Sequence, residues 1–203
     1  MTIIDRVFLL LTGLIAAYMI YYFFKKNNEE KCSCNYYFIL SFLVLLVAGL
    51  ILIFSGWDAL ANNFVAVVAG LIPFGLATGL IAKHYKKNEL WYAILMLIGL
   101  ILITYTRYAG AEKLGKIVYP IFHAIAGLTI FFVPIILKMK EKVSSNYLFI
   151  TVGGTLIGLG GIALAFLKAG KQLLFFSQDF VLMILAPLLF FTALFFMLGF
   201  TKE

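Results

Sequence analysis

Charged side chains are scarce in this 203-residue sequence: Asp, Glu, Lys and Arg make up 12% of it, whereas hydrophobic residues make up 64%. A soluble domain carries roughly 25% charged and about 45–50% apolar residues. A soluble fold of this length could not remove so much apolar surface from water. A bilayer accepts such surface because lipid replaces water around it. The composition therefore excludes an ordinary soluble protein and predicts an integral membrane protein.

Residue patterns that support catalysis are also missing. The sequence contains no Gly-x-Ser-x-Gly, no His-Glu-x-x-His and no phosphate-binding glycine loop. Its two histidines are too few for a site with three histidine ligands. Membrane hydrolysis is therefore disfavoured, and the sequence favours a protein that is not an enzyme.

Cysteine is limited to Cys32 and Cys34, which flank a single serine next to an apolar run. No further cysteine and no nearby histidine completes a four-ligand zinc site. A disulfide across one intervening residue is uncommon, so we expect two free thiols beside the membrane. Reversible acylation of one of these thiols is the alternative.

Seven apolar runs are long enough to cross a bilayer, which requires about 20 residues per helix. The connections between them are too short to fold separately. We therefore predict an all-α polytopic membrane protein whose single transmembrane domain covers residues 1–203 and contacts the lipid bilayer. The predicted spans are 7–24, 36–56, 64–83, 91–109, 117–138, 147–167 and 179–200.

The basic residues predict the orientation, because cytoplasmic loops carry an excess of lysine and arginine. One side of the bilayer receives ten of them: Lys25, Lys26, Lys31, Lys83, Lys86, Lys87, Lys138, Lys140, Lys142 and Lys202. The other side receives six: Arg6, Arg107, Lys113, Lys116, Lys168 and Lys171. We expect the N-terminus outside and the C-terminus in the cytoplasm of a cell with this protein in its plasma membrane. The net charge of +7 fits clusters facing anionic headgroups and does not indicate nucleic acid.

Weak internal similarity is consistent with a duplication of three helices. Such a parallel repeat would have halves 1–87 and 115–203, joined by a linker helix at 91–109. Similar matches also arise by chance in a sequence this rich in Leu, Ile and Phe. The matching pairs include Asn35 with Asn146, Tyr36 with Tyr147, Phe38 with Phe149, Gly49 with Gly160, Pro73 with Pro187 and Thr78 with Thr192.

This plan of three, one and three helices resembles, in outline, the microbial rhodopsins and the SWEET sugar transporters. The first resemblance would imply a retinal-binding lysine in the middle of the seventh helix, and residues 180–198 contain no lysine. The second would imply a Pro-Gln type signature, which the sequence lacks. Neither resemblance extends to the residues that characterise the family, so no family is assigned.

Small residues predict where helices approach closely, because packing rather than the hydrophobic effect joins helices in lipid. The third run carries Gly75 and Gly79, and the sixth carries Gly154, Gly158 and Gly161 on one face. We expect these two runs to pack most closely and to form a seam between the proposed halves.

Prolines inside the runs predict bends, since each one removes a backbone hydrogen bond. Pro73, Pro134 and Pro187 lie within spans, where a kink opens room between helices. Pro120 is expected in the first turn of its helix, where the missing N–H is not needed.

The few polar residues of the spans gather toward the predicted outer side. Ionisable groups are expensive in a membrane, so each is a functional candidate. Arg107 could bind an anion or pair with Asp179, and His123 could relay a proton or ligate a metal or heme. The sequence predicts a shallow outward-facing pocket built from Arg107, His123, Asp179, Asp58, Asn63, Tyr105 and Tyr119.

Three functions remain open from the sequence. The first is a small transporter or channel-like protein for a proton, an ion or a small solute. The second is a non-catalytic subunit or assembly partner of a larger membrane complex, because the chain lacks mid-membrane carboxylates. The partner would then be that complex or, in a homo-oligomer, a second copy of the chain. The third is an electron carrier with b-type heme on His123.

Overall fold

A computed structural model describes residues 1–168 and 177–202, which are helical with short connections and contain no β-strand. Within these residues, seven segments are long and apolar enough to cross a membrane. The predictions of an all-α fold and of seven helices long and apolar enough to cross a membrane are therefore confirmed. The helices are α1 (Ile3–Glu30), α2 (Ser33–Ser55), α3 (Asn63–Ala69), α4 (Leu71–His84), α5 (Glu89–Tyr108), α6 (Glu112–Met139), α7 (Phe149–Lys168) and α8 (Gln178–Thr201). Short 3-10 turns are η1 (Trp57–Ala61), η2 (Lys86–Asn88) and η3 (Ser145–Leu148).

Helix α1 is longer than the apolar run that predicts it, because polar residues cap both of its ends. The Thr2 hydroxyl accepts the Asp5 N–H at 3.2 Å, and the Asp5 carboxylate accepts the Thr2 N–H at 2.7 Å. This reciprocal capping box satisfies backbone donors that the helix leaves unpaired. At the other end, Lys31 adopts a left-handed conformation with φ of 45° and stops the helix.

The third span is broken into α3 and α4 at Gly70. Pro73 has no N–H to donate to the carbonyl of residue 69, and its ring crowds that carbonyl. The break therefore falls in the turn before the proline, as the sequence predicts. Pro120 differs from its prediction: α6 begins at Glu112, so this proline lies in the helix interior and not in the first turn.

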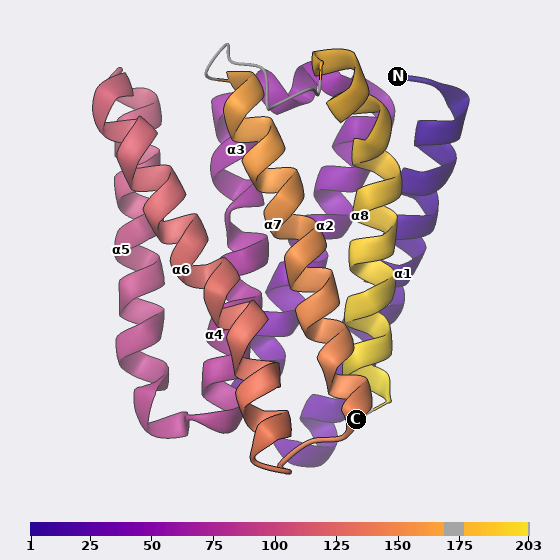
Figure 1. Ribbon diagram of the computed structural model, residues 1–203, viewed down its shortest axis with the longest axis vertical. Coiled ribbons are helices and arrows are strands. Elements are labelled where there is room, and N and C mark those ends of the chain that lie inside the picture. The colour runs from indigo at the N-terminus through magenta and orange to yellow at the C-terminus, as the bar shows by residue number, and fades with distance from the viewer. Residues whose placement is uncertain (169–176, 203) are drawn as a thin grey trace.

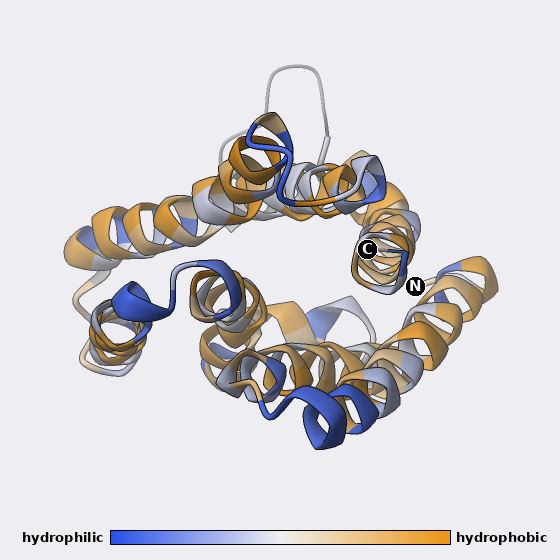
Figure 2. Ribbon diagram, turned by 90° about the horizontal axis from the view of Figure 1, so that it is seen from below, coloured by the Kyte–Doolittle hydropathy of each residue, from blue (hydrophilic) through white to orange (hydrophobic). Residues whose placement is uncertain are grey.

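The helices follow one another around a closed ring. The ring runs α1, α2, α4, α5, α6, α7 and α8, and α8 packs back against α1. Figures 1 and 2 show α6, α7 and α8 on one side of the bundle and α1, α2, α4 and α5 on the other. Helix α4 also contacts α6, which leaves α5 at the periphery.

The connections divide the bundle into two ends. The α1–α2, α4–α5 and α6–α7 connections lie with the C-terminus at the bottom of Figure 1. We call this the basic end, and the end that carries the N-terminus the N-terminal end. Hydrophilic residues of the connections stand out at the basic end in Figure 2, whereas the helices are largely apolar. Lys171, assigned by the sequence to the N-terminal end, falls outside the described residues.

The glycine seam between the third and sixth spans was a wrong prediction. Helix α4 packs against α2, α5 and α6, and α7 packs against α6 and α8. A Cβ atom at Gly75 would lie 2.9 Å from the Tyr37 carbonyl of α2, and Gly79 faces the Phe38 ring of the same helix. Gly154 and Gly161 face Ile130 and His123 of α6, and a Cβ at Gly158 would meet nothing within 4 Å. The small residues permit close approach, but those that contact another helix face a neighbouring helix of the ring.

The largest buried side chains gather near the basic end. Phe38 and Phe200 have ring centroids 4.7 Å apart, and Phe23 lies 4.7 Å from Phe38 and 5.3 Å from Phe200. Tyr147, with 0% exposure, packs edge-on against Phe200. This aromatic cluster (Phe23, Phe38, Tyr147 and Phe200) joins α1, α2, η3 and α8. Towards the N-terminal end a smaller core contains Leu9, Leu52, Ala59 and Ala186.

Candidate functional site

Four of the seven predicted pocket residues come together near the N-terminal end. The Arg107 guanidinium of α5 lies 5.7 Å from the centroid of the Tyr119 ring of α6. Tyr119 stacks on His123, one helical turn further along α6, with centroids 5.5 Å apart and ring planes 16° apart. Asn63 donates its amide to the Arg107 carbonyl at 3.3 Å. We call Arg107, Tyr119 and His123 the stacked ladder.

The other three predicted residues lie apart from the ladder. Asp179 is exposed in the first turn of α8, next to Ser177, whose hydroxyl accepts the Phe180 N–H at 3.2 Å. A carboxylate at this position is favoured by the helix dipole. Asp58 is exposed in η1, and Tyr105 is 59% exposed on α5. Among the described residues, no ion pair joins Arg107 to Asp179.

His123 lies deeper than the sequence indicates. Because α6 begins at Glu112, the histidine is roughly 16 Å along the helix axis at about 1.5 Å per residue. Its Nε2 atom would be 2.6 Å from a Cβ at Gly161, so the ring packs directly against the α7 backbone. Its buried Nδ1 atom has no hydrogen-bond partner. A heme plane has no room between Nε2 and α7 in this arrangement, so the residues present do not fit a heme on Nε2.

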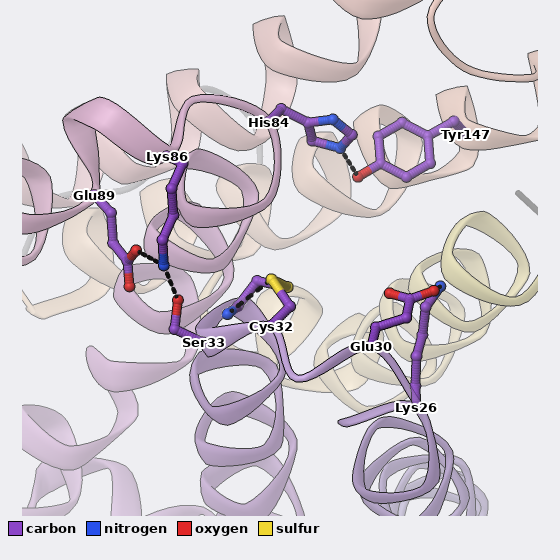
Figure 3. Close-up of a disulfide and its surroundings, with 9 residues drawn as sticks. Lys26, Glu30, Cys32, Ser33, His84, Lys86, Glu89 and Tyr147 are labelled. Carbon is purple, nitrogen blue, oxygen red and sulfur yellow. Dashed lines mark hydrogen bonds and ion pairs between the residues drawn. A yellow bond between two sulfur atoms is a disulfide. The ribbon is translucent and has the colours of Figure 1, made fainter. Parts of the chain in front are cut away.

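The basic end is richer in polar links between helices. The Tyr22 hydroxyl of α1 donates to the Phe200 carbonyl of α8 at 3.0 Å. His84 Nε2 of α4 lies 2.8 Å from the Tyr147 hydroxyl, which Figure 3 shows. His84 is partly exposed at the end of α4, but its imidazole is held by a hydrogen bond to a fully buried tyrosine. No sequence signal pairs two residues that lie 63 positions apart.

A hollow of about 320 Å³ opens beside these links at the basic end. Lys26 forms an ion pair with Glu30 at 3.7 Å and lies 5.8 Å from the Tyr22 ring centroid. Lys83 reaches in from α4 and lies 5.5 Å from the Tyr147 ring centroid. Two lysines and one glutamate are among the described residues that line the hollow. Its lining residues are Tyr22, Lys26, Glu30, Lys83, Phe200 and Thr201.

The two cysteines of the basic end are joined in a disulfide, and the expectation of free thiols was wrong. Residues two apart in a helix point in different directions, but Cys32 precedes α2 with an extended backbone, at φ −88° and ψ 127°. Its side chain can therefore turn back over the first turn and reach Cys34, with the Cα atoms 5.2 Å apart. Figure 3 shows the disulfide beside the Lys86 side chain, which donates to the Ser33 hydroxyl at 2.6 Å and pairs with Glu89.

No grouping of three or more His, Cys, Asp or Glu side chains suited to a metal ion occurs in the described part of the chain. The chain matches no protein-family model, no curated protein and no solved structure.

Proposed function

We propose that this chain is a membrane transporter for a small anionic solute, and that the hollow at the basic end is its binding site. The observation that carries the proposal is the convergence of Lys26 from α1 and Lys83 from α4 on one hollow that α8 completes. Its volume of about 320 Å³ lies at the lower end of the roughly 300–1,000 Å³ that small-molecule sites span. Lysine ammonium groups bind carboxylate and phosphate oxygens through charge-assisted hydrogen bonds.

The contacts between helices support a two-half organisation. If α1, α2 and α4 correspond to α6, α7 and α8, then the contact of α1 with α8 corresponds to that of α6 with α4. Likewise, the contact between α1 and α2 corresponds to the contact between α6 and α7. The contact between α2 and α4 corresponds to the contact between α7 and α8. Every one of these contacts is present, and α5 lies outside the pattern, as a linker would. This symmetry favours the proposed parallel repeat with halves 1–87 and 115–203.

The position of the hollow suits a carrier better than an open channel. It lies where α1 and α4 of the first half meet α8 of the second. The aromatic cluster, with Phe38 and Tyr147 at 1% and 0% exposure, fills the bundle beside it. Carriers bind substrate near the bilayer midplane where two repeats meet, and expose it alternately by rocking one repeat against the other. The hollow lies at such a junction of the proposed halves, but at the basic end.

The orientation follows from charge. With ten of sixteen basic residues at the basic end, we place this end in the cytoplasm and the protein in the plasma membrane. Seven spans then put the N-terminus outside, and the hollow opens to the cytoplasm. No described feature favours the alternative of a subunit in a larger complex, and the packing of His123 against α7 opposes the heme alternative.

Uptake by liposomes that contain the full chain tests the transporter proposal. We use radiolabelled succinate and inorganic phosphate as probes of the two anion chemistries, and expect saturable uptake of at least one above protein-free liposomes. Lys83→Gln should raise the KM of that uptake about tenfold, because a hydrogen bond to a charged group contributes roughly 1.5–3 kcal/mol.

Lys87→Gln is the matched control, because Lys87 is exposed in η2, just after the end of α4, and does not line the hollow. It should leave the KM unchanged. Absence of saturable uptake for both anions, or equal KM values in the Lys83 and Lys87 variants, contradicts the proposed site.

A further inference from the structure

The disulfide at the start of α2 is asymmetric. Cys34 lies inside the first turn with 2% of its surface exposed, whereas Cys32 stands at the N-cap and is partly exposed. A thiol in solution can therefore reach one sulfur of the pair and not the other. Attack on Cys32 would release Cys34, and the buried thiol would remain in place to close the bond again.

The surroundings of Cys32 favour its thiolate. The N-terminus of a helix carries partial positive charge, and cysteines at such positions or beside lysines have enhanced thiolate character. The Cys34 N–H donates to the Cys32 sulfur at 3.3 Å. Lys31 is adjacent in sequence, and Lys86 approaches through Ser33, although Glu89 offsets part of the charge of Lys86.

The proposed orientation adds an independent argument. The charge bias puts the α1–α2 connection in the cytoplasm, where small thiols keep structural disulfides reduced. Disulfides that do occur there are mostly transient, with catalytic or redox-sensing roles. A bonded pair at this end is therefore explained by exchange better than by a static cross-link.

We infer that Cys32 and Cys34 form a thiol–disulfide exchange site for small or peptide thiols at the basic end, with Cys32 as the attacked and attacking sulfur. A substrate thiolate attacks the Cys32 sulfur, the Cys32–Cys34 bond breaks, and its electron pair leaves on Cys34, which takes up a proton. A second substrate thiolate attacks the substrate sulfur of this mixed disulfide. The substrate disulfide forms and the electron pair leaves on Cys32. Two thiols are oxidised and the chain gains two thiols, so the exchange balances, and glutathione disulfide reverses it.

Single-cysteine variants of the full chain in nanodiscs test this inference with glutathione disulfide as the probe. Cys34→Ser retains the exposed thiol, and Cys32→Ser retains the buried one, so the two variants control each other. We expect Cys34→Ser to form the mixed disulfide at least about tenfold faster, because reactivity follows thiolate character and access. Mass spectrometry gives the rates, and size-exclusion chromatography checks that both variants remain folded.

The wild-type chain provides a second readout, because it has only two cysteines and maleimide labelling reports on this pair alone. As the ratio of oxidised to reduced glutathione in the buffer is lowered, the disulfide should open. It should form again when the ratio is raised. A bond that stays closed in excess reduced glutathione, or equal rates in the two variants, overturns the inference. Labelling of Cys32 in the Cys34→Ser variant by an impermeant maleimide added outside intact cells also overturns it, because the pair would then lie in an oxidising compartment.

Discussion

The two ends of the bundle are held together in different ways. At the basic end, polar side chains cross between the proposed halves: Tyr22 of α1 bonds α8, and His84 of α4 bonds Tyr147 of η3. At the N-terminal end, the polar links among the described residues run from Asn63 of α3 to α5, and from Arg107 of α5 to Tyr119 of α6. The links at the basic end join the proposed halves directly, whereas the N-terminal links run through the peripheral helix α5.

This difference bears on how a transporter of this shape would work. The contacts that surround the hollow are the same contacts that tie α1 to α8 and α4 to η3. Under the proposed function, a solute that displaced Lys26 from Glu30, or shifted Tyr22, would act directly on the junction between the proposed halves. The N-terminal end would then have fewer polar contacts to break if the proposed halves moved.

The largest expected effect comes from removing an aromatic side chain at the basic end. Phe38→Ala should lower the free energy of unfolding by about 3–5 kcal/mol, because a ring that is 1% exposed leaves a cavity. Phe54→Ala, on the same helix at the N-terminal end, removes a ring that is 82% exposed and should change stability by less than about 1 kcal/mol. Denaturation by SDS in mixed micelles measures both, and equal losses would remove the contrast between the ends.

A smaller effect is expected from a methyl group added where α8 and α7 pack closely at the basic end. A Cβ at Gly199 of α8 would lie 2.9 Å from the Ile150 nitrogen of α7, and backbone cannot yield as a side chain can. Gly199→Ala should therefore cost about 1–3 kcal/mol of unfolding free energy through overpacking. Gly158→Ala is the control, since open space surrounds it, and alanine's helix propensity should leave stability unchanged or raise it by up to about 1 kcal/mol. Thermal unfolding in detergent gives the ranking, which a destabilised Gly158 variant would reverse.

The smallest expected effect concerns one hydroxyl. Tyr147→Phe removes the 2.8 Å hydrogen bond to His84 and should cost about 1 kcal/mol of unfolding free energy. Tyr105→Phe removes an exposed hydroxyl near the N-terminal end and should have no measurable effect. Each change deletes one tyrosine hydroxyl, so the two variants differ only in the end of the bundle and the surroundings from which that hydroxyl is lost. An equal response of the two variants in SDS denaturation would show that the polar link between the halves contributes nothing.

Particular residues show which parts of the fold can be predicted from the sequence. The spans are predictable because a bilayer demands about 20 apolar residues per crossing, and the break near Pro73 follows from its missing N–H. The start of α6 was not predictable from hydropathy, because helix extends through the polar residues that precede the apolar run. The stacked ladder was partly predictable: Tyr119 and His123 are four apart on one helix, a spacing at which side chains meet.

The sequence by itself determined that the chain is a bundle of membrane-spanning helices and how its basic residues divide between two ends, since both follow from local composition. Only the tertiary structure decided which side chains meet. Gly75 packs on α2 and not on the sixth span, His84 reaches Tyr147, and Cys32 bonds Cys34. The physical reason is that lipid solvates the apolar outer face of every helix equally well. Hydropathy therefore does not encode the order of helices around the ring, which depends on side-chain packing between elements far apart in the chain.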